Sequence, residues 1–346
     1  MKRLASALTG VMLMAALVSG CSTVAPSAAS TPSTPTASAT EAPAARTTIR
    51  IASLKGPTTM GLVKLMSDAA AGQGKQNYQV TMYGTPDEIV PLIAKGEVDV
   101  ALLPANLASV LYNKTKTASG SQLEVAAINT LGMLEVVEAG NTVHSIADLK
   151  GKTIYSTGKG ASPEYVLDYL LEKNGLDPAK DVNVQFTSEA TELAATLATK
   201  PNAIGVLPQP YVTVLKSKNP AIRTALSLTD EWAKVTPDSQ MVTGVVAVRT
   251  AFATAHKAAF NDFLTDYKAS TTFTNAQPAK AAPLIAAAGI VPTAAIAETA
   301  IPACHITDIE GGQLTSTLNG YLKVLFTADP ASVGGSMPGD GFYYSR

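Results

Sequence analysis

Two Lys-Gly loops, about 104 residues apart, carry the residue types that hold a small polar ligand. They run from Lys55 to Met60 and from Lys159 to Ser162, each between an apolar segment and an expected helix. Glycine lets the backbone approach a ligand closely, and unpaired amides gather at a helix start. Such a loop with its lysine favours an anion or an oxygen-rich group. For either loop alone, a capped helix start with a solvated lysine is the simpler interpretation.

A second matched pair of segments, Leu103–Asn106 and Leu207–Tyr211, reads as a strand end that opens a helix. The amide groups of Asn106 and Gln209 can give hydrogen bonds of fixed direction to a ligand. Helix capping and core packing are the alternative interpretation. Neither pair contains the phosphate-binding pattern of the nucleotide hydrolases, so a nucleotide is not indicated.

These segments belong to two copies of one pattern, at Ile51–Lys114 and Ile154–Lys218. Both copies alternate apolar strands with helices, which predicts an α/β fold whose mainly parallel sheets are covered by helices. Ligands of such sheets bind beyond the carboxyl ends of the strands, where the loops stand. The sequence therefore predicts two similar lobes, each with a Lys-Gly loop at the place where a ligand would bind. Asn129 and Thr243 mark the expected crossings between lobes, as hinge, ligand contact or both.

The expected elements fill the chain from residue 47 onward. Strands are expected at 48–53, 79–83, 98–103, 125–129, 133–137, 152–156, 181–186, 203–207 and 240–248. Helices are expected at 58–70, 86–95, 106–112, 144–150, 164–174 and 190–198, with several more in 252–326 and an irregular tail from 334. The first lobe is then 47–131 plus 242–346, and the second lobe is 132–241.

Composition excludes one class of partner. The 346 residues are 46% hydrophobic, which is enough for two lobes with their own cores. Because 26 Lys and Arg are balanced by 27 Asp and Glu, the net charge is -1 and no dense basic block appears. We therefore expect no nucleic-acid partner.

The N-terminus reads as a bacterial lipoprotein signal over residues 1–20. A basic start is followed by the apolar stretch Leu4–Val18 and then by small residues before Cys21. Cys21 is then the lipidated first residue of the mature protein, and the Ala, Ser, Thr and Pro of residues 22–46 form a tether. An ordinary secretory peptide or a membrane anchor is the alternative.

The remaining cysteine and the histidines indicate no cofactor or metal. With Cys21 acylated, Cys304 has no disulfide partner, and a buried thiol is expected there rather than a ligand or nucleophile. The spacing of the histidines fits no zinc site. Pro283, Gly289 and Pro292 interrupt the Ala-rich stretch 281–301, so we expect short packed helices rather than a membrane span.

Taken together, Lys55–Met66, Val98–Leu111, Lys159–Leu171 and Leu207–Val214 resemble the nitrate, sulfonate and taurine family of substrate-binding proteins of bacterial ABC importers. The resemblance covers residues 47–321 and implies a type II periplasmic-binding-protein fold. Leu207–Tyr211 departs from the acidic and aromatic residues of many members, which leaves the ligand class open. The implied ligand contacts are Lys55, Gly56, Pro57, Thr58, Thr59, Met60, Pro104, Ala105, Asn106, Asn129, Lys159, Gly160, Ala161, Ser162, Gln209 and Thr243.

The resulting expectation is an extracytoplasmic lipoprotein, anchored to the cell membrane, that captures a small molecule and delivers it to an ABC permease. The two lysines favour an anionic ligand such as a sulfonate, and a polar or aromatic heterocycle is the alternative. We expect a monomer without a cofactor, and no catalysis, because no nucleophile with a base stands out in the sequence. A lipid-anchored enzyme and a sensory or scaffold lipoprotein on the same fold are the alternatives.

Overall fold

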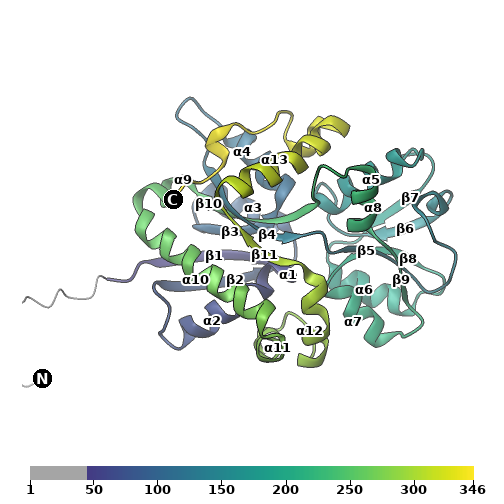
Figure 1. Ribbon diagram of the computed structural model, residues 1–346, viewed down its shortest axis with the longest axis horizontal. Helices are drawn as coiled ribbons and strands as arrows, with labels where there is room; N and C mark the ends of the chain where they lie inside the picture. The colour runs from purple at the N-terminus through teal and green to yellow at the C-terminus, as the bar shows by residue number, and fades with distance from the viewer. Residues whose placement is uncertain (1–44) are drawn as a thin grey trace, which may run out of the picture. The chain divides into compact units, whose positions relative to one another are not determined.

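The computed structural model describes residues 45–346, and the predicted signal peptide, Cys21 and nearly all of the tether lie outside them. Strands of the described residues form two sheets, which stand side by side in Figure 1. We call the six-stranded sheet with its helices the first lobe, and the five-stranded sheet with its helices the second lobe. The predicted α/β class with two sheets is confirmed. The predicted limits of the lobes stay a prediction.

The strand orders of the two sheets show the repeat. The first sheet runs β11 (Ile306–Ile309), β4 (Leu123–Leu131), β10 (Val242–Arg249), β3 (Val100–Pro104), β1 (Thr48–Leu54) and β2 (Asn77–Tyr83). The second sheet runs β7 (Asn183–Phe186), β6 (Thr153–Ser156), β8 (Ile204–Pro208), β5 (Leu134–Glu138) and β9 (Arg223–Ser227). From β10 to β2 and from β5 to β7, the two orders match strand for strand. The loops at Lys55 and Lys159 therefore follow equivalent strands, β1 and β6.

Both sheets are mixed, whereas the sequence predicted mainly parallel strands. β1 pairs in parallel with β2 and β3, and β6 pairs in parallel with β7 and β8. β10 runs antiparallel to β3 and β4, and β5 runs antiparallel to β8 and β9. The reason is the route of the chain, since β10 and β5 each enter their sheet from the other lobe.

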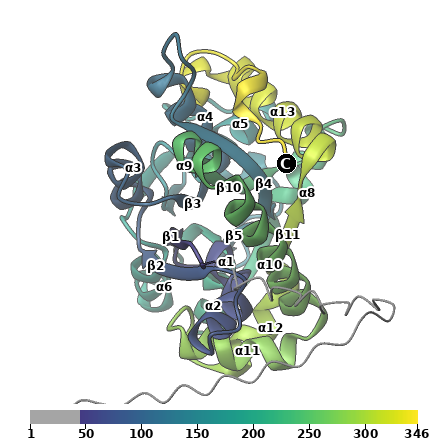
Figure 2. The same ribbon diagram turned by 90° about the vertical axis from the view of Figure 1, so that its left-hand side faces the viewer.

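Alternation along the strands decides which helices cover each face of the first sheet. Ile49 and Ile51 of β1 face one way, toward α2 (Val63–Ala70), α9 (Thr250–Ala255) and α10 (Lys257–Ala276). Ala52 faces the other way, toward α3 (Pro86–Lys95), α4 (Ala105–Thr115) and α13 (Gly311–Ala328). In Figures 1 and 2, α4 and α13 accordingly lie above these strands and α2 lies below them.

The second sheet is covered in the same way, by α5 (Ser162–Lys173) and α8 (Leu228–Val235) on one face and by α6 (Ala190–Thr199) and α7 (Tyr211–Lys218) on the other. Trp232 of α8 packs between Tyr169 of α5 and Tyr321 of α13, with ring centroids 5.0 and 5.4 Å away. Because α13 covers the first sheet, this aromatic cluster joins the cores of the two lobes.

Several elements differ from the sequence prediction. The helix predicted at 58–70 is divided into α1 (Pro57–Met60) and α2, with Gly61 and Leu62 between them. Gly61 packs closely, since a Cβ there would be 3.1–3.2 Å from Thr271 and Ile306. The region predicted at 144–150 is a 3₁₀ turn, η1 (Ile146–Leu149). The sequence did not predict β9, α8 or β11. The C-terminal tail contains two more short turns, η3 (Pro330–Val333) and η4 (Asp340–Phe342).

The Ala-rich region forms α11 (Pro278–Ala287), α12 (Ala294–Ala300) and the turn η2 (Ile301–Cys304), as short packed helices. Cys304 is a buried free thiol whose Sγ lies 3.7 Å from Sδ of Met60, and burial raises its pKa. Within residues 45–346, no helix combines the length and the apolar character that a membrane crossing requires.

The chain passes between the sheets at two adjacent places. β4 and β10 are neighbours, with Leu131 paired to Val242, and the amide of Gly132 donates to the carbonyl of Met241 over 2.9 Å. Gly132 and Met133 both have left-handed backbones, with φ of 49° and 75°. Such a conformation is costly for methionine, so the surrounding structure must hold it.

Candidate ligand-binding site

The two Lys-Gly loops meet at one cavity of about 120 Å³, which we call the inter-lobe cavity. Seven of the predicted ligand residues line it: Lys55, Pro57, Thr58, Pro104, Ala161, Ser162 and Thr243. They come from both lobes, and the loops stand at the carboxyl ends of β1 and β6. This is where ligands of parallel strands bind.

The other nine predicted residues do not line the cavity. Thr59, Met60 and Ala105 are buried in the core, and Lys159 is exposed. The remaining five, which make structural contacts around the cavity, are Gly56, Asn106, Asn129, Gly160 and Gln209. The two lysines, which match in the sequence, therefore have different surroundings.

Hydroxyl groups and an aromatic ring hold the first loop rigidly. Thr58 and Thr59 both donate to the carbonyl of Leu54, over 2.6 Å in each case. Tyr211 of the second lobe lies against Gly56, where an added Cβ would be 3.5 Å from the ring, and its hydroxyl donates to the carbonyl of Lys55 over 3.1 Å. Burial raises the pKa of Tyr211, so this hydroxyl keeps its proton.

In the second loop, the side chain of Glu164 occupies a backbone amide. The amide of Gly160 donates to the carboxylate of Glu164 in the first turn of α5. Gly158 and Gly160 have φ of 72° and 74°, a region that favours glycine. Glu164 stands where the first loop has Met60, so a carboxylate that occupies the amide of Gly160 has no counterpart at that place in the first loop.

Lys55 is the only charged side chain that lines the inter-lobe cavity, and within residues 45–346 it forms no ion pair. No carboxylate of the described residues therefore competes with an anionic ligand for its ammonium group. An anion placed there would gain a charge-assisted hydrogen bond in surroundings of low polarity. Five prolines contribute to the walls, and since proline lacks an amide hydrogen, these walls offer a ligand few backbone donors.

Most hydroxyl groups that line the cavity already donate their hydrogen to an oxygen of the protein. Thr58 donates to the carbonyl of Leu54, and Thr243 donates to the carbonyl of Thr130 over 3.2 Å. Ser162 and Tyr211 likewise donate to protein oxygens. A hydroxyl has one hydrogen and two lone pairs, so each of these groups has only acceptor capacity left.

Asn129 presents one unsatisfied donor. Its side chain is fully buried, its Oδ1 accepts from the hydroxyl of Thr130 over 2.8 Å, and its Nδ2 has no partner among the described residues. Oδ1 packs so closely on Gly244 that a Cβ there would be 2.3 Å away. Buried amides are rarely left without a partner, so a water or ligand atom is expected at this group.

Twelve lining residues were missed by the sequence analysis as ligand contacts. Most lie beside predicted positions, and Pro208 and Tyr211 carried a signal, since both belong to the second matched pair of segments. Gly84 and Ser188 come from equivalent loops after β2 and β7, which no motif marked. The full set is Leu54, Gly84, Pro86, Met133, Leu134, Thr157, Gly158, Pro163, Ser188, Ala190, Pro208 and Tyr211.

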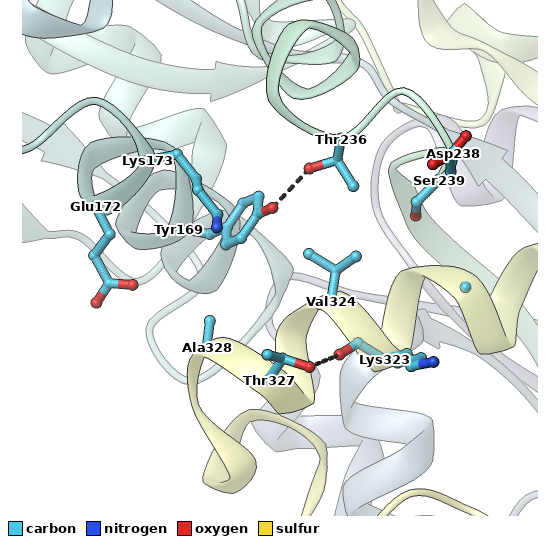
Figure 3. A pocket seen from close by; sticks show the side chains of 11 residues that line it. Tyr169, Glu172, Lys173, Thr236, Asp238, Ser239, Lys323, Val324, Thr327 and Ala328 are labelled. Atoms are coloured by element: carbon cyan, nitrogen blue, oxygen red, sulfur yellow. Dashed lines mark hydrogen bonds between the residues drawn. The ribbon is translucent and has the colours of Figure 1, made fainter.

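A larger hollow of about 660 Å³ lies elsewhere, between α5, α13 and the segment after α8 (Figure 3). Tyr169 and Thr236 share a hydrogen bond of 2.7 Å in its wall. None of the predicted ligand residues lines it. Its charges are balanced, with two acids and two lysines, Glu172, Asp238, Lys173 and Lys323. The smaller inter-lobe cavity is the candidate site because both loops converge on it.

Solved structures share this fold. An ABC transporter from Parabacteroides distasonis has 21% identity and a TM-score of 0.70, covering 87% of this chain and 99% of that one. The alkanesulfonate-binding protein of Xanthomonas axonopodis pv. citri bound to MOPS has 16% identity and a TM-score of 0.65, covering 86% and 96%. The periplasmic nitrate-binding protein of Synechocystis PCC 6803 has 12% identity and a TM-score of 0.60, covering 83% and 84%. They establish the periplasmic-binding-protein fold.

No curated protein shows significant sequence similarity to the chain. Residues 62–297 match the family described as ABC transporter, phosphonate, periplasmic substrate-binding protein. The match confirms the predicted class, the substrate-binding component of an ABC importer. Since the matched residues make up well over half of the sequence, the chain belongs to the family of phosphonate periplasmic substrate-binding proteins of ABC transporters.

Proposed function

We propose that this protein captures a small anionic solute in the inter-lobe cavity and delivers it to an ABC permease. The observation that carries the proposal is Lys55, the single charged side chain of the lining. The cavity of about 120 Å³ is below the usual size of drug-sized sites, about 300–1,000 Å³, which supports a solute of few atoms. Phosphonates, sulfonates and nitrate are the candidate classes.

The hydroxyl groups that already donate to protein oxygens narrow the class of ligand that the cavity can bind. Of the side chains in the lining, Lys55, Thr157 and Ser188 remain as hydrogen-bond donors, and the other four hydroxyls offer acceptors. A solute with one anionic group and a hydrogen-bond donor of its own would satisfy both sets. Lys55 and Tyr211 are the only titratable side chains of the lining, which supports binding rather than catalysis.

A thermal-shift panel on the full chain in detergent tests the proposal. We expect ethylphosphonate, ethanesulfonate or nitrate to raise the Tm, and 2-aminoethyl counterparts to raise it further. A ligand at 100 times its Kd adds about 2.7 kcal/mol to stability. Ethylammonium, which lacks the anionic group, is the matched control. Stabilisation by ethylammonium with no response to any of the anions would refute an anionic cargo.

We also propose that Cys21 carries the lipid anchor and that residues 22–46 tether the protein to the outer face of the membrane. The support is the order of basic, apolar and small residues before Cys21. In a bacterial host, replacing Cys21 by Ser should abolish radiolabelled palmitate incorporation and membrane retention by acyl chains. Cys304→Ser is the control, since that thiol is buried, and it should keep the label. Equal labelling of both variants would contradict the anchor.

A further inference from the structure

Asn106 does not line the inter-lobe cavity, although the sequence predicted it as a ligand contact. It is the second residue of α4 and is fully buried. Its Nδ2 donates to the carbonyl of Gly160 over 3.3 Å and to the carbonyl of Ser332 over 3.1 Å, and its Oδ1 accepts from the hydroxyl of Ser162 over 3.2 Å. Both amide hydrogens are therefore used within the protein.

These bonds connect the two lobes. Gly160 and Ser162 belong to the second Lys-Gly loop and the start of α5, whereas Asn106 and Ser332 belong to the first lobe. Two of the three bonds of Asn106 thus cross the boundary, and both end on the loop that forms one wall of the inter-lobe cavity. The position of that wall depends on Asn106 without any contact between Asn106 and the solute.

Within the first lobe, further hydrogen bonds fix α4, the helix that carries Asn106. Ser109 and Asn113 follow Asn106 on the same face of α4, and each donates to the carbonyl of Val333 over 2.9 Å. The three residues therefore form one polar row that binds the turn η3. Asn106 is the member of the row at the end of α4 nearest the cavity, and only its bonds continue into the second lobe.

We propose that Asn106 is a latch, a positioning residue that stabilises the closed arrangement of the lobes by holding Gly160 and Ser162. The inference rests on the proposed capture between two lobes but not on the charge of the solute. Opening the cavity breaks both bonds of Asn106 that cross the boundary and exposes the buried amide to water. The latch therefore shifts the balance between open and closed forms and slows the escape of a bound solute.

The test is a distance measurement that needs no ligand. Spin labels at Asp87→Cys in α3 and Glu192→Cys in α6 occupy exposed positions, one in each lobe. We expect Asn106→Ala to lower the ratio of closed to open molecules about tenfold or more in the full chain, because two net hydrogen bonds are lost. Ser109→Ala is the matched control, since its bond remains inside the first lobe, and it should keep the wild-type ratio.

Circular dichroism of each variant establishes that the fold is intact before the distances are compared. An unchanged ratio in folded Asn106→Ala would overturn the latch, as would an equal loss in Ser109→Ala. Asn106→Gln gives a second route, because its longer side chain keeps the amide but displaces it, and it should also favour the open form. Failure of the latch leaves the anion panel unaffected, and failure of the panel leaves these distances interpretable.

Discussion

Lys55→Met should weaken the binding of the anion that gives the largest thermal shift by about 10- to 100-fold. Methionine keeps much of the length and apolar character of the lysine but removes the only charge that lines the inter-lobe cavity. A hydrogen bond to a charged group contributes about 1.5–3 kcal/mol, and about 1.4 kcal/mol corresponds to a tenfold change in Kd. Isothermal titration calorimetry of the full chain measures the effect directly.

The repeat supplies the control for this prediction. Lys159 occupies the equivalent place in the second loop, but its side chain is exposed and does not line the cavity. Lys159→Met should change the Kd by less than about twofold, since exposed charges contribute little. Equal losses in the two variants would mean that a general positive field attracts the anion. No loss in either would show that the ligand does not bind at Lys55.

Asp308→Asn should make the stability of the protein less dependent on pH between pH 5 and 8. Both carboxyl oxygens of Asp308 are buried without a partner among the described residues. Burial, and then the neighbouring carboxylate of Glu310, raise the pKa of Asp308 to about 7 from its usual value near 3.8. Lys268 and Arg346 act in the opposite direction but do not offset these effects. Tyr267 of α10 is the remaining titratable neighbour.

The sign of the pH effect follows from the raised pKa. The folded protein holds the proton of Asp308 more tightly than the unfolded chain does. Protonated Asp308 therefore contributes its full share to the free energy of unfolding below pH 3.8, and this share is lost as pH rises toward 7. If Asp308 were completely buried, this shift in its pKa would change the free energy of unfolding by about 4 kcal/mol. Because solvent screens part of it, we expect about 1–2 kcal/mol, or a few degrees in Tm.

Urea unfolding at pH 5 and pH 8 measures this difference for the wild type and the variant. Asp168 also has a pKa raised to about 7, by burial and then by Glu164, Glu172 and Asp329. Asp168→Asn should therefore remove a separate share of the pH dependence, and the double variant should lose both. If Asp308→Asn kept the full wild-type difference, the carboxyl group would be hydrated in the folded protein.

The sequence predicted the repeat because local signals were strong there. Pro86–Lys95 is a helix with the predicted bounds, since Thr85 and Glu88 form a capping box and Gly96 ends it. The strands β3 and β8 start at residues 100 and 204, which is the offset read from the sequence. By contrast, β11 was missed because its four residues pair irregularly with β4, and no periodic pattern marks them.

The ligand-binding site was harder to predict, because residues at equivalent positions of the two repeats have different neighbours in the fold. Lys55 and Lys159 match in the repeat, yet only Lys55 lines the cavity. Asn106 was chosen for its amide, but its three protein partners come from residues 160, 162 and 332, which are far away in sequence. Gln209 is likewise bonded, to Glu135 over 2.8 Å. Motifs identify the loops, whereas tertiary contacts decide which side chains remain free.

The paired crossing of the chain has a mechanical consequence. Because β4 and β10 leave the first sheet side by side, tied by the bond from Gly132 to Met241, twisting one lobe against the other would shear that bond. Bending both strands together leaves it intact. We therefore expect the lobes to move apart by bending at this crossing rather than by twisting, which would separate Gly160 from Asn106 without turning one loop past the other.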